Sequence, residues 1–134
     1  MFLMKLRPEE KFAFLHIAHF IATSDGELEK RENEIIEEYC MEMGIDNIIF
    51  DINLFDLEKE LQKFKSRQSQ KILLMELMVL IHADDIFAEK EHHIVDNVAE
   101  IFGFDPITKQ HFSHWGKAVN ALYSQGKLFS QSLS

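Results

Sequence analysis

Residues 11–46 read KFAFLHIAHFIATSDGELEKRENEIIEEYCMEMGID, and residues 70–105 read QKILLMELMVLIHADDIFAEKEHHIVDNVAEIFGFD. The two stretches align with an offset of 59 residues and no gap. Their identical pairs are Leu15 and Leu74, Asp25 and Asp84, Glu32 and Glu91, Ile35 and Ile94, Gly44 and Gly103, Asp46 and Asp105. Amphipathic helices paired by chance share their apolar spacing, but they rarely share a loop, an acid and a terminal glycine in one register. The sequence therefore predicts two copies of one helical unit.

The first helix of each copy is apolar on nearly every side. We expect these two helices at about residues 8–23, opened by Pro8 ahead of Glu9 and Glu10, and at about residues 67–83. A helix without a polar face must be covered all round. The two helices should therefore lie at the centre of the domain, mostly against each other, with the amphipathic helices outside them.

Apolar spacing and helix-boundary residues place the other helices. Two are expected at about residues 29–43 and 88–102, and a glycine, Gly44 or Gly103, follows each of them. A third should begin at Asn53 as its N-cap, and Asp105 with Pro106 should open the last one. Their inner faces are expected to include Ile101 and Leu122.

These elements define an all-α fold. We expect a compact bundle of about six to seven helices, built from two duplicated three-helix units around two central apolar helices. The whole of residues 1–134 would form one domain, with repeat 1 at about 8–65, repeat 2 at about 67–123 and a tail at 124–134 that can fray.

Composition excludes several classes of function. The chain has 134 residues, 14 Lys and Arg against 23 Asp and Glu, and a formal net charge of −9, so it should repel nucleic acid. Its single cysteine, Cys40, excludes a disulfide framework and a multi-cysteine metal site. The longest apolar stretch, residues 72–83, is too short to span a membrane, and no signal peptide is evident. We expect a cytoplasmic protein.

The repeated loops carry the clearest candidate for chemistry. In each loop an Asp ends the apolar helix and a Glu lies in the first turn of the next helix, and the second loop adds Asp85. Hard divalent cations such as Ca²⁺ and Mg²⁺ take carboxylate, carbonyl and water oxygens as ligands. The same residues also suit a purely structural role, since an Asp can end a helix and a Glu can cap the next. The sequence leaves both readings open.

The turn Asp-Gly-x-apolar-x-x-x-Glu between an all-apolar and an amphipathic helix, present at 25–32 and in modified form at 84–91, resembles the TerB-like family. That family includes the tellurite-resistance protein TerB and the N-terminal region of some DnaJ-type membrane co-chaperones. The resemblance covers about residues 8–122 and implies a bacterial cytoplasmic protein linked to stress response. It also implies a divalent metal, with Ca, Mg, Mn and Zn not distinguished, held by Asp25, Glu32, Asp84 and Glu91. Asp85 stands where the motif has Gly and offers a further ligand, so the second loop departs from the pattern.

Histidine and cysteine give weaker signals. His16 and His19 share a helix face, but no zinc signature accompanies them, and both are expected to be core histidines with hydrogen-bond partners. His111 and His114 should be solvated. Cys40 lies on an inner stripe, which suits a buried apolar residue better than a nucleophile. Glu76 is the lone acid of its helix, so it must reach a polar partner or a cleft open to water.

Three classes of function remain. The first is a TerB-like, non-enzymatic stress-response module that binds a divalent ion and a protein partner. The second is a metal-independent scaffold whose acidic surface docks basic partners. The third, an enzyme, has least support, because no phosphate loop or nucleophile elbow is present.

Overall fold

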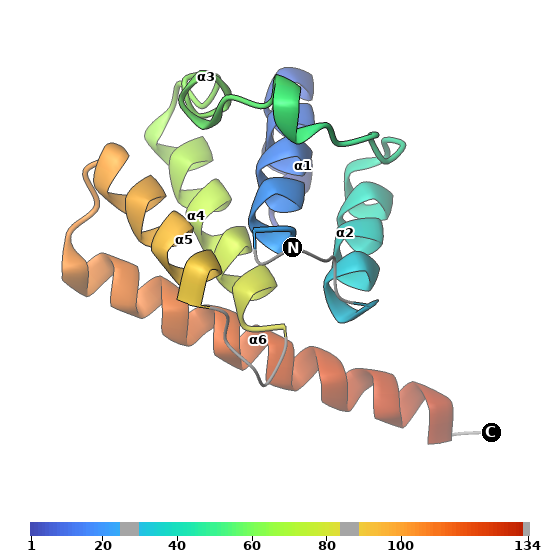
Figure 1. Ribbon diagram of the computed structural model, residues 1–134. Helices are drawn as coiled ribbons and strands as arrows, with labels where there is room; N and C mark the ends of the chain where they lie inside the picture. Colours follow the sequence, from blue (N-terminus) through green and yellow to red (C-terminus); the bar gives the residue numbers. More distant parts are fainter. Residues whose placement is uncertain (25–29, 84–88, 133–134) are drawn as a thin grey trace.

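The computed structural model describes residues 1–24, 30–83 and 89–132 (Figure 1). These residues form six α-helices: α1 (Pro8–Ala22), α2 (Lys30–Met43), α3 (Leu57–Leu61), α4 (Arg67–Ile81), α5 (Glu89–Ile101) and α6 (Pro106–Ser132). Two short 3₁₀ helices precede α1 and α3, η1 at Leu3–Lys5 and η2 at Ile52–Leu54. No strand occurs within the described ranges. The all-α prediction is confirmed.

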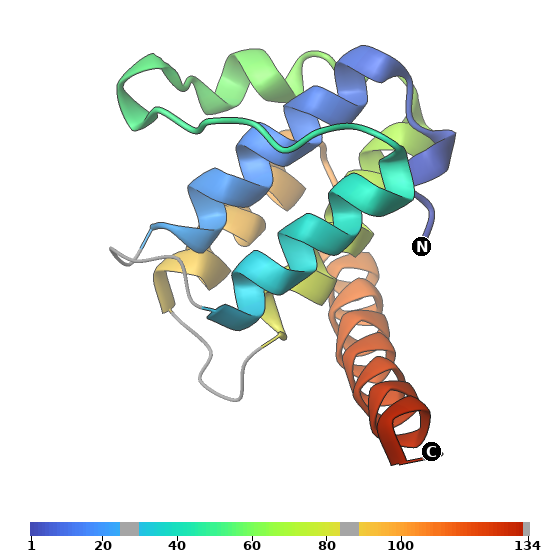
Figure 2. The same ribbon diagram turned by 90° about the vertical axis from the view of Figure 1, so that its right-hand side faces the viewer.

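Helices α1 and α4 form the core. Their apolar side chains are almost all buried, and the two helices contact each other as expected. However, α4 packs most extensively along α6 rather than against α1 (Figures 1 and 2). A glycine permits that close packing, because Gly116 of α6 lies directly on the backbone of Met78 in α4.

The helix boundaries follow local sequence signals. Pro8 is the first residue of α1, and the Glu10 carboxylate accepts a hydrogen bond from the Arg7 backbone N–H at 2.9 Å. Gly44 and Gly103 follow α2 and α5 with φ of 69° and 73°, in the left-handed region that glycine enters without strain. The expected glycine ends are confirmed.

The segment between α2 and α4 differs from the expectation. Asn53 does not cap a helix; instead the Asp51 carboxylate accepts from the Asn53 backbone N–H at 2.9 Å and holds the short η2 turn. The chain is extended at Phe55, and Asp56 then caps α3 by accepting from the Lys59 N–H. Two aspartates five residues apart can each start a turn, and the spacing of leucines alone does not choose between them.

Helix α6 is longer than expected. It continues through residues 124–132, part of the tail that can fray, and its last turns extend beyond the other helices (Figures 1 and 2). Leu122 and Ile101, both expected on inner faces, are exposed. For Leu122 the reason is geometric, because α6 turns its opposite side toward α4 at Gly116 and Asn120.

The duplicated units remain a prediction. Helices α1 and α2 contact each other, as do α4 and α5, and a positive-φ glycine follows the second helix of each pair. The third helices differ, since α3 has 5 residues and α6 has 27. Any structural repeat is therefore confined to the first two helices of each unit.

Candidate functional site

The predicted metal ligands fall partly on described residues. Asp25, Asp84 and Asp85 lie outside the described residues. Glu32 and Glu91 are described, and each is the third residue of its helix, α2 or α5. Their exposed fractions are 3% and 4%. Glutamate is rarely buried to this degree without a partner for its charge, so the two equivalent positions share an unusual environment.

The histidines and the cysteine behave as structural residues. His19 is buried and its Nε2 lies 2.9 Å from the Asn47 Oδ1, while the Asn47 side-chain amide donates to Glu37. His16 Nδ1 donates to the Phe12 carbonyl of its own helix at 2.8 Å. Both histidines thus have a polar partner, as expected. His16 is only partly buried, however, because it lies one turn after the exposed Phe12, so the expectation of a core position is wrong for His16. In the described part of the chain, no group of three or more His, Cys, Asp or Glu is arranged to hold a metal ion.

Cys40 is buried and has no disulfide partner. Burial, with a smaller contribution from the nearby Glu37 and Asp46, raises the pKa of its thiol to about 11. The thiolate, which is the reactive form, is therefore scarce at neutral pH. This agrees with the expected structural role.

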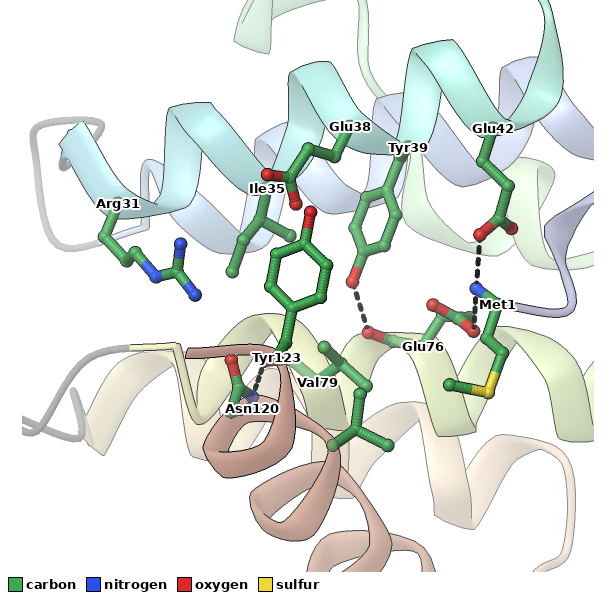
Figure 3. Close-up of a pocket in the computed structure, with 11 residues that line it drawn as sticks. Met1, Arg31, Ile35, Glu38, Tyr39, Glu42, Glu76, Val79, Asn120 and Tyr123 are labelled. Atoms are coloured by element: carbon green, nitrogen blue, oxygen red, sulfur yellow. Dashed lines mark hydrogen bonds and ion pairs between the residues drawn. The ribbon is translucent and has the colours of Figure 1, made fainter. Parts of the chain in front are cut away.

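A groove between α2, α4 and α6 is one of the concave sites in the described residues (Figure 3). Its volume is about 260 Å³. Apolar side chains from each helix line it (Ile35, Val79 and Val119), and so do two tyrosines, Tyr39 and Tyr123. The sequence alone does not reveal this groove, because its walls come from three helices whose packing depends on tertiary contacts.

Glu76 forms the floor of the groove. It is almost fully buried, and its Oε1 lies 3.1 Å from the Met1 ammonium, which also pairs with Glu42 (Figure 3). The Phe2 backbone N–H donates to the same oxygen at 3.4 Å. Burial raises the pKa of Glu76, and the ammonium partly offsets that rise. The expectation that this lone acid must find a polar partner is confirmed, although its partner was not foreseen.

Tyr39 closes the floor from α2. Its hydroxyl donates to the Glu76 backbone carbonyl at 2.8 Å (Figure 3). Burial, together with the nearby carboxylates of Glu76, Glu42 and Glu38, raises the pKa of Tyr39 well above its usual value. Tyr39 therefore stays a neutral donor, and it ties α2 to α4 at the middle of the groove.

The mouth of the groove is formed by α2 and α6. The Asn120 amide donates to the Val79 carbonyl at 2.7 Å, and Lys127 pairs with Glu38 at 3.1 Å. Figure 3 shows the Tyr123 ring between Asn120 and Glu38, with Arg31 beside it. With Glu38, Glu42 and Glu76 beside two aromatic rings, the groove suits a positively charged group, and its floor already holds an ammonium.

Comparison of the chain with protein-family models, curated proteins and solved structures found no match. The resemblance to the TerB-like family therefore rests on the repeated loop motif alone. Among the described helices, none combines the length and the apolar character that crossing a membrane requires.

Proposed function

We propose that this chain is a non-enzymatic, TerB-like module of stress response, in which the two acidic loops bind a divalent metal ion and control contact with a protein partner. The observation that carries the proposal is the burial of Glu32 and Glu91 at the same position of two helices 59 residues apart. Buried carboxylates are normally paired, hydrogen-bonded or bound to a metal. An acid that only complements a helix dipole can do so from an exposed position.

The donors fit a hard cation. Glu32 and Glu91 offer carboxylate oxygens, and the aspartates predicted to join them, Asp25, Asp84 and Asp85, offer more of the same. A cation between the end of one helix and the start of the next would relieve repulsion among these acids. It would also hold the two helices at a fixed angle, which links metal binding to the shape that a partner meets.

Thermal unfolding in Ca²⁺, Mg²⁺, Mn²⁺ or Zn²⁺ against chelator tests this proposal. A ligand specific to the folded state adds about 2.7 kcal/mol at 100 times its dissociation constant. In a domain of this size that raises the melting temperature by on the order of 10 °C. We expect Glu32→Gln and Asp25→Asn to reduce the rise, and Glu34→Gln, a partly exposed acid of the same helix that pairs with Arg31, to leave it intact.

The alternative is a metal-independent scaffold whose acidic surface docks basic proteins. The net charge of −9 favours it. A melting temperature that no metal changes, with Glu32→Gln as stable as the parent, would reject the metal role and leave this alternative. A rise that survives both loop substitutions would place the metal elsewhere, and Asp84, Asp85 and Glu91 would be substituted next.

A further inference from the structure

Residues 45–56, which we call the acidic strap, cross one side of the molecule between α2 and α3 (Figure 1). Ile49 and Leu54 are 98% and 85% exposed there, and Ile52 is exposed as well. The strap contains three aspartates (Asp46, Asp51 and Asp56) and no Lys, Arg or His. The strap itself is therefore apolar and acidic, with Lys90 and His93 of α5 beside Ile52.

The outer face of α6 has the opposite character. Leu122 and Leu128 are 68% and 64% exposed, and Ile107 near the start of the helix is exposed too. At 100° per residue these three side chains fall within about 120° of arc, on the side away from Gly116 and Asn120. Leu122 and Leu128 form an apolar stripe in the second half of the helix. Ile107 lies on the same side near the start of the helix, with the exposed His111 and His114 between it and the stripe.

Helix α6 also carries the opposite charge. It contains three lysines and no Asp or Glu, in a chain whose net charge is −9. Lys109 and Lys127 pair with Asp96 and Glu38 of the same chain. Lys117 is exposed next to the apolar stripe, together with His111 and His114. The border of this stripe is neutral to positive.

The two surfaces lie on opposite sides of the molecule. In both ribbon views the strap lies in the upper half of the molecule and α6 in the lower half (Figures 1 and 2). Because the acidic strap and the outer face of α6 lie on opposite sides, identical molecules can stack on one another in one direction. A contact between two copies of the same stripe would instead bring like charges together.

Six large apolar side chains are exposed on the two surfaces: Ile49, Ile52 and Leu54 on the strap, and Ile107, Leu122 and Leu128 on α6. Apolar patches that are large and bordered by polar groups usually mark interaction sites.

We propose that the protein associates with itself head to tail, the outer face of α6 in one copy docking on the acidic strap of the next. The two leucines of the stripe meet the apolar strap residues, and Lys117 meets the strap aspartates. Because the two surfaces differ, the contact is heterologous, so it produces rings or open chains rather than a closed two-fold dimer. This inference is independent of the proposed metal role.

Sedimentation velocity across a range of concentrations tests it, with the full chain in chelator and again with divalent metal. We expect the average mass to rise with concentration beyond that of a dimer, and higher salt to weaken the contact. A protein that is still monomeric at about 1 mM, where even a contact of about −4 kcal/mol is half-formed, overturns the proposal. Association in chelator distinguishes it from the proposed metal role.

Two double variants identify the surfaces. Ile49→Ser with Leu54→Ser alters only the strap, and Leu122→Gln with Leu128→Gln alters only α6. Each should weaken self-association roughly tenfold or more, because exposed leucines and isoleucines supply the apolar contact. Met41→Gln, an exposed apolar residue of α2 outside both surfaces, should leave association unchanged.

Mixing the two double variants gives the decisive result. One retains a native α6 face and the other a native strap, so the mixture should form a one-to-one dimer that grows no further. Circular dichroism checks that each variant keeps its helices. If the α6 variant alone abolishes association while the strap variant does not, the contact is between two α6 helices and the head-to-tail proposal is wrong.

Discussion

Gly116 of α6 lies so close to Met78 of α4 that a Cβ at position 116 would be 2.7 Å from the Met78 carbonyl carbon. Real Cβ atoms do not approach backbone this closely, so the pair fixes where α6 crosses α4. The crossing also sets the direction of α6, because Asn120, one turn later, donates to the Val79 carbonyl at 2.7 Å.

The first prediction concerns this crossing. Gly116→Ala should destabilise the fold by about 1–3 kcal/mol, since the new methyl group must push two helices apart. Gly126→Ala is the matched control, because nothing lies within 4 Å of its Cβ position in the same helix. That control should stabilise α6 by about 0.5–1 kcal/mol. Denaturant unfolding measures both, and an equal gain from the two alanines would contradict the close approach.

The second prediction concerns Glu76. Its folded-state pKa is raised above 4.5, chiefly by burial. The folded state therefore holds this proton more tightly than the unfolded state, and the resulting stability is present below about pH 4.5 and lost as pH rises through the folded pKa. As the pH rises through this range, the parent should lose stability relative to Glu76→Gln, whose side chain cannot ionise. If the difference in unfolding free energy between the two proteins stays constant with pH, Glu76 does not titrate abnormally.

The third prediction has the opposite sign. Burial, helped by Lys117, His92 and His114, lowers the pKa of His82 from 6.5 to about 4, while its Nε2 lies 2.8 Å from the Ser113 hydroxyl. Stability from neutral His82 is complete above pH 6.5 and is lost as pH falls toward 4. Because the ring is partly exposed, we expect a loss of only about 1 kcal/mol.

The variant His82→Gln keeps a hydrogen-bonding group but cannot take up the proton. It should remove that part of the pH dependence, which unfolding at pH 7, 5.5 and 4.5 would reveal. If the unfolding free energy of the variant falls between pH 6.5 and 4.5 as steeply as that of the parent, the titration belongs to another group.

Local signals in the sequence predicted much of the fold. Pro8, Gly44 and Gly103 act through backbone geometry that needs no tertiary partner, and their predicted positions are confirmed. The all-apolar helices likewise require burial wherever they pack. Such features can be read from a single sequence because each is dictated within a few residues.

Features that depend on packing were not predictable in the same way. The sequence places Leu122 in an apolar stripe but does not say which side of α6 meets α4. Gly116 determines that side through its contact with Met78 of α4, 38 residues earlier in the chain. The groove was missed for the same reason, since Tyr39, Glu76 and Asn120 come from three separate helices. The need of Glu76 for a polar partner was predictable from the cost of burying a charge, but the identity of the partner was not.

The last prediction concerns Arg67, which begins α4. Its guanidinium lies over the Phe104 ring, 3.8 Å from the ring centroid, and donates to the Phe102 carbonyl just after α5. A planar guanidinium can stack and donate at once, whereas a lysine ammonium lacks the planar shape. Arg67→Lys should therefore cost about 1 kcal/mol despite keeping the charge, and Arg67→Ala about 1–2 kcal/mol.

Lys71→Ala, an exposed cation one turn further along α4, is the matched control and should change stability by less than about 0.5 kcal/mol. Denaturant unfolding compares the three variants at one pH and salt concentration. If Arg67→Lys is as stable as the parent, charge alone holds the end of α5 against the start of α4, and the stacked geometry contributes nothing. A loss shared by Arg67→Lys and Arg67→Ala, with Lys71→Ala unaffected, assigns the stability to the stacked guanidinium and its hydrogen bond.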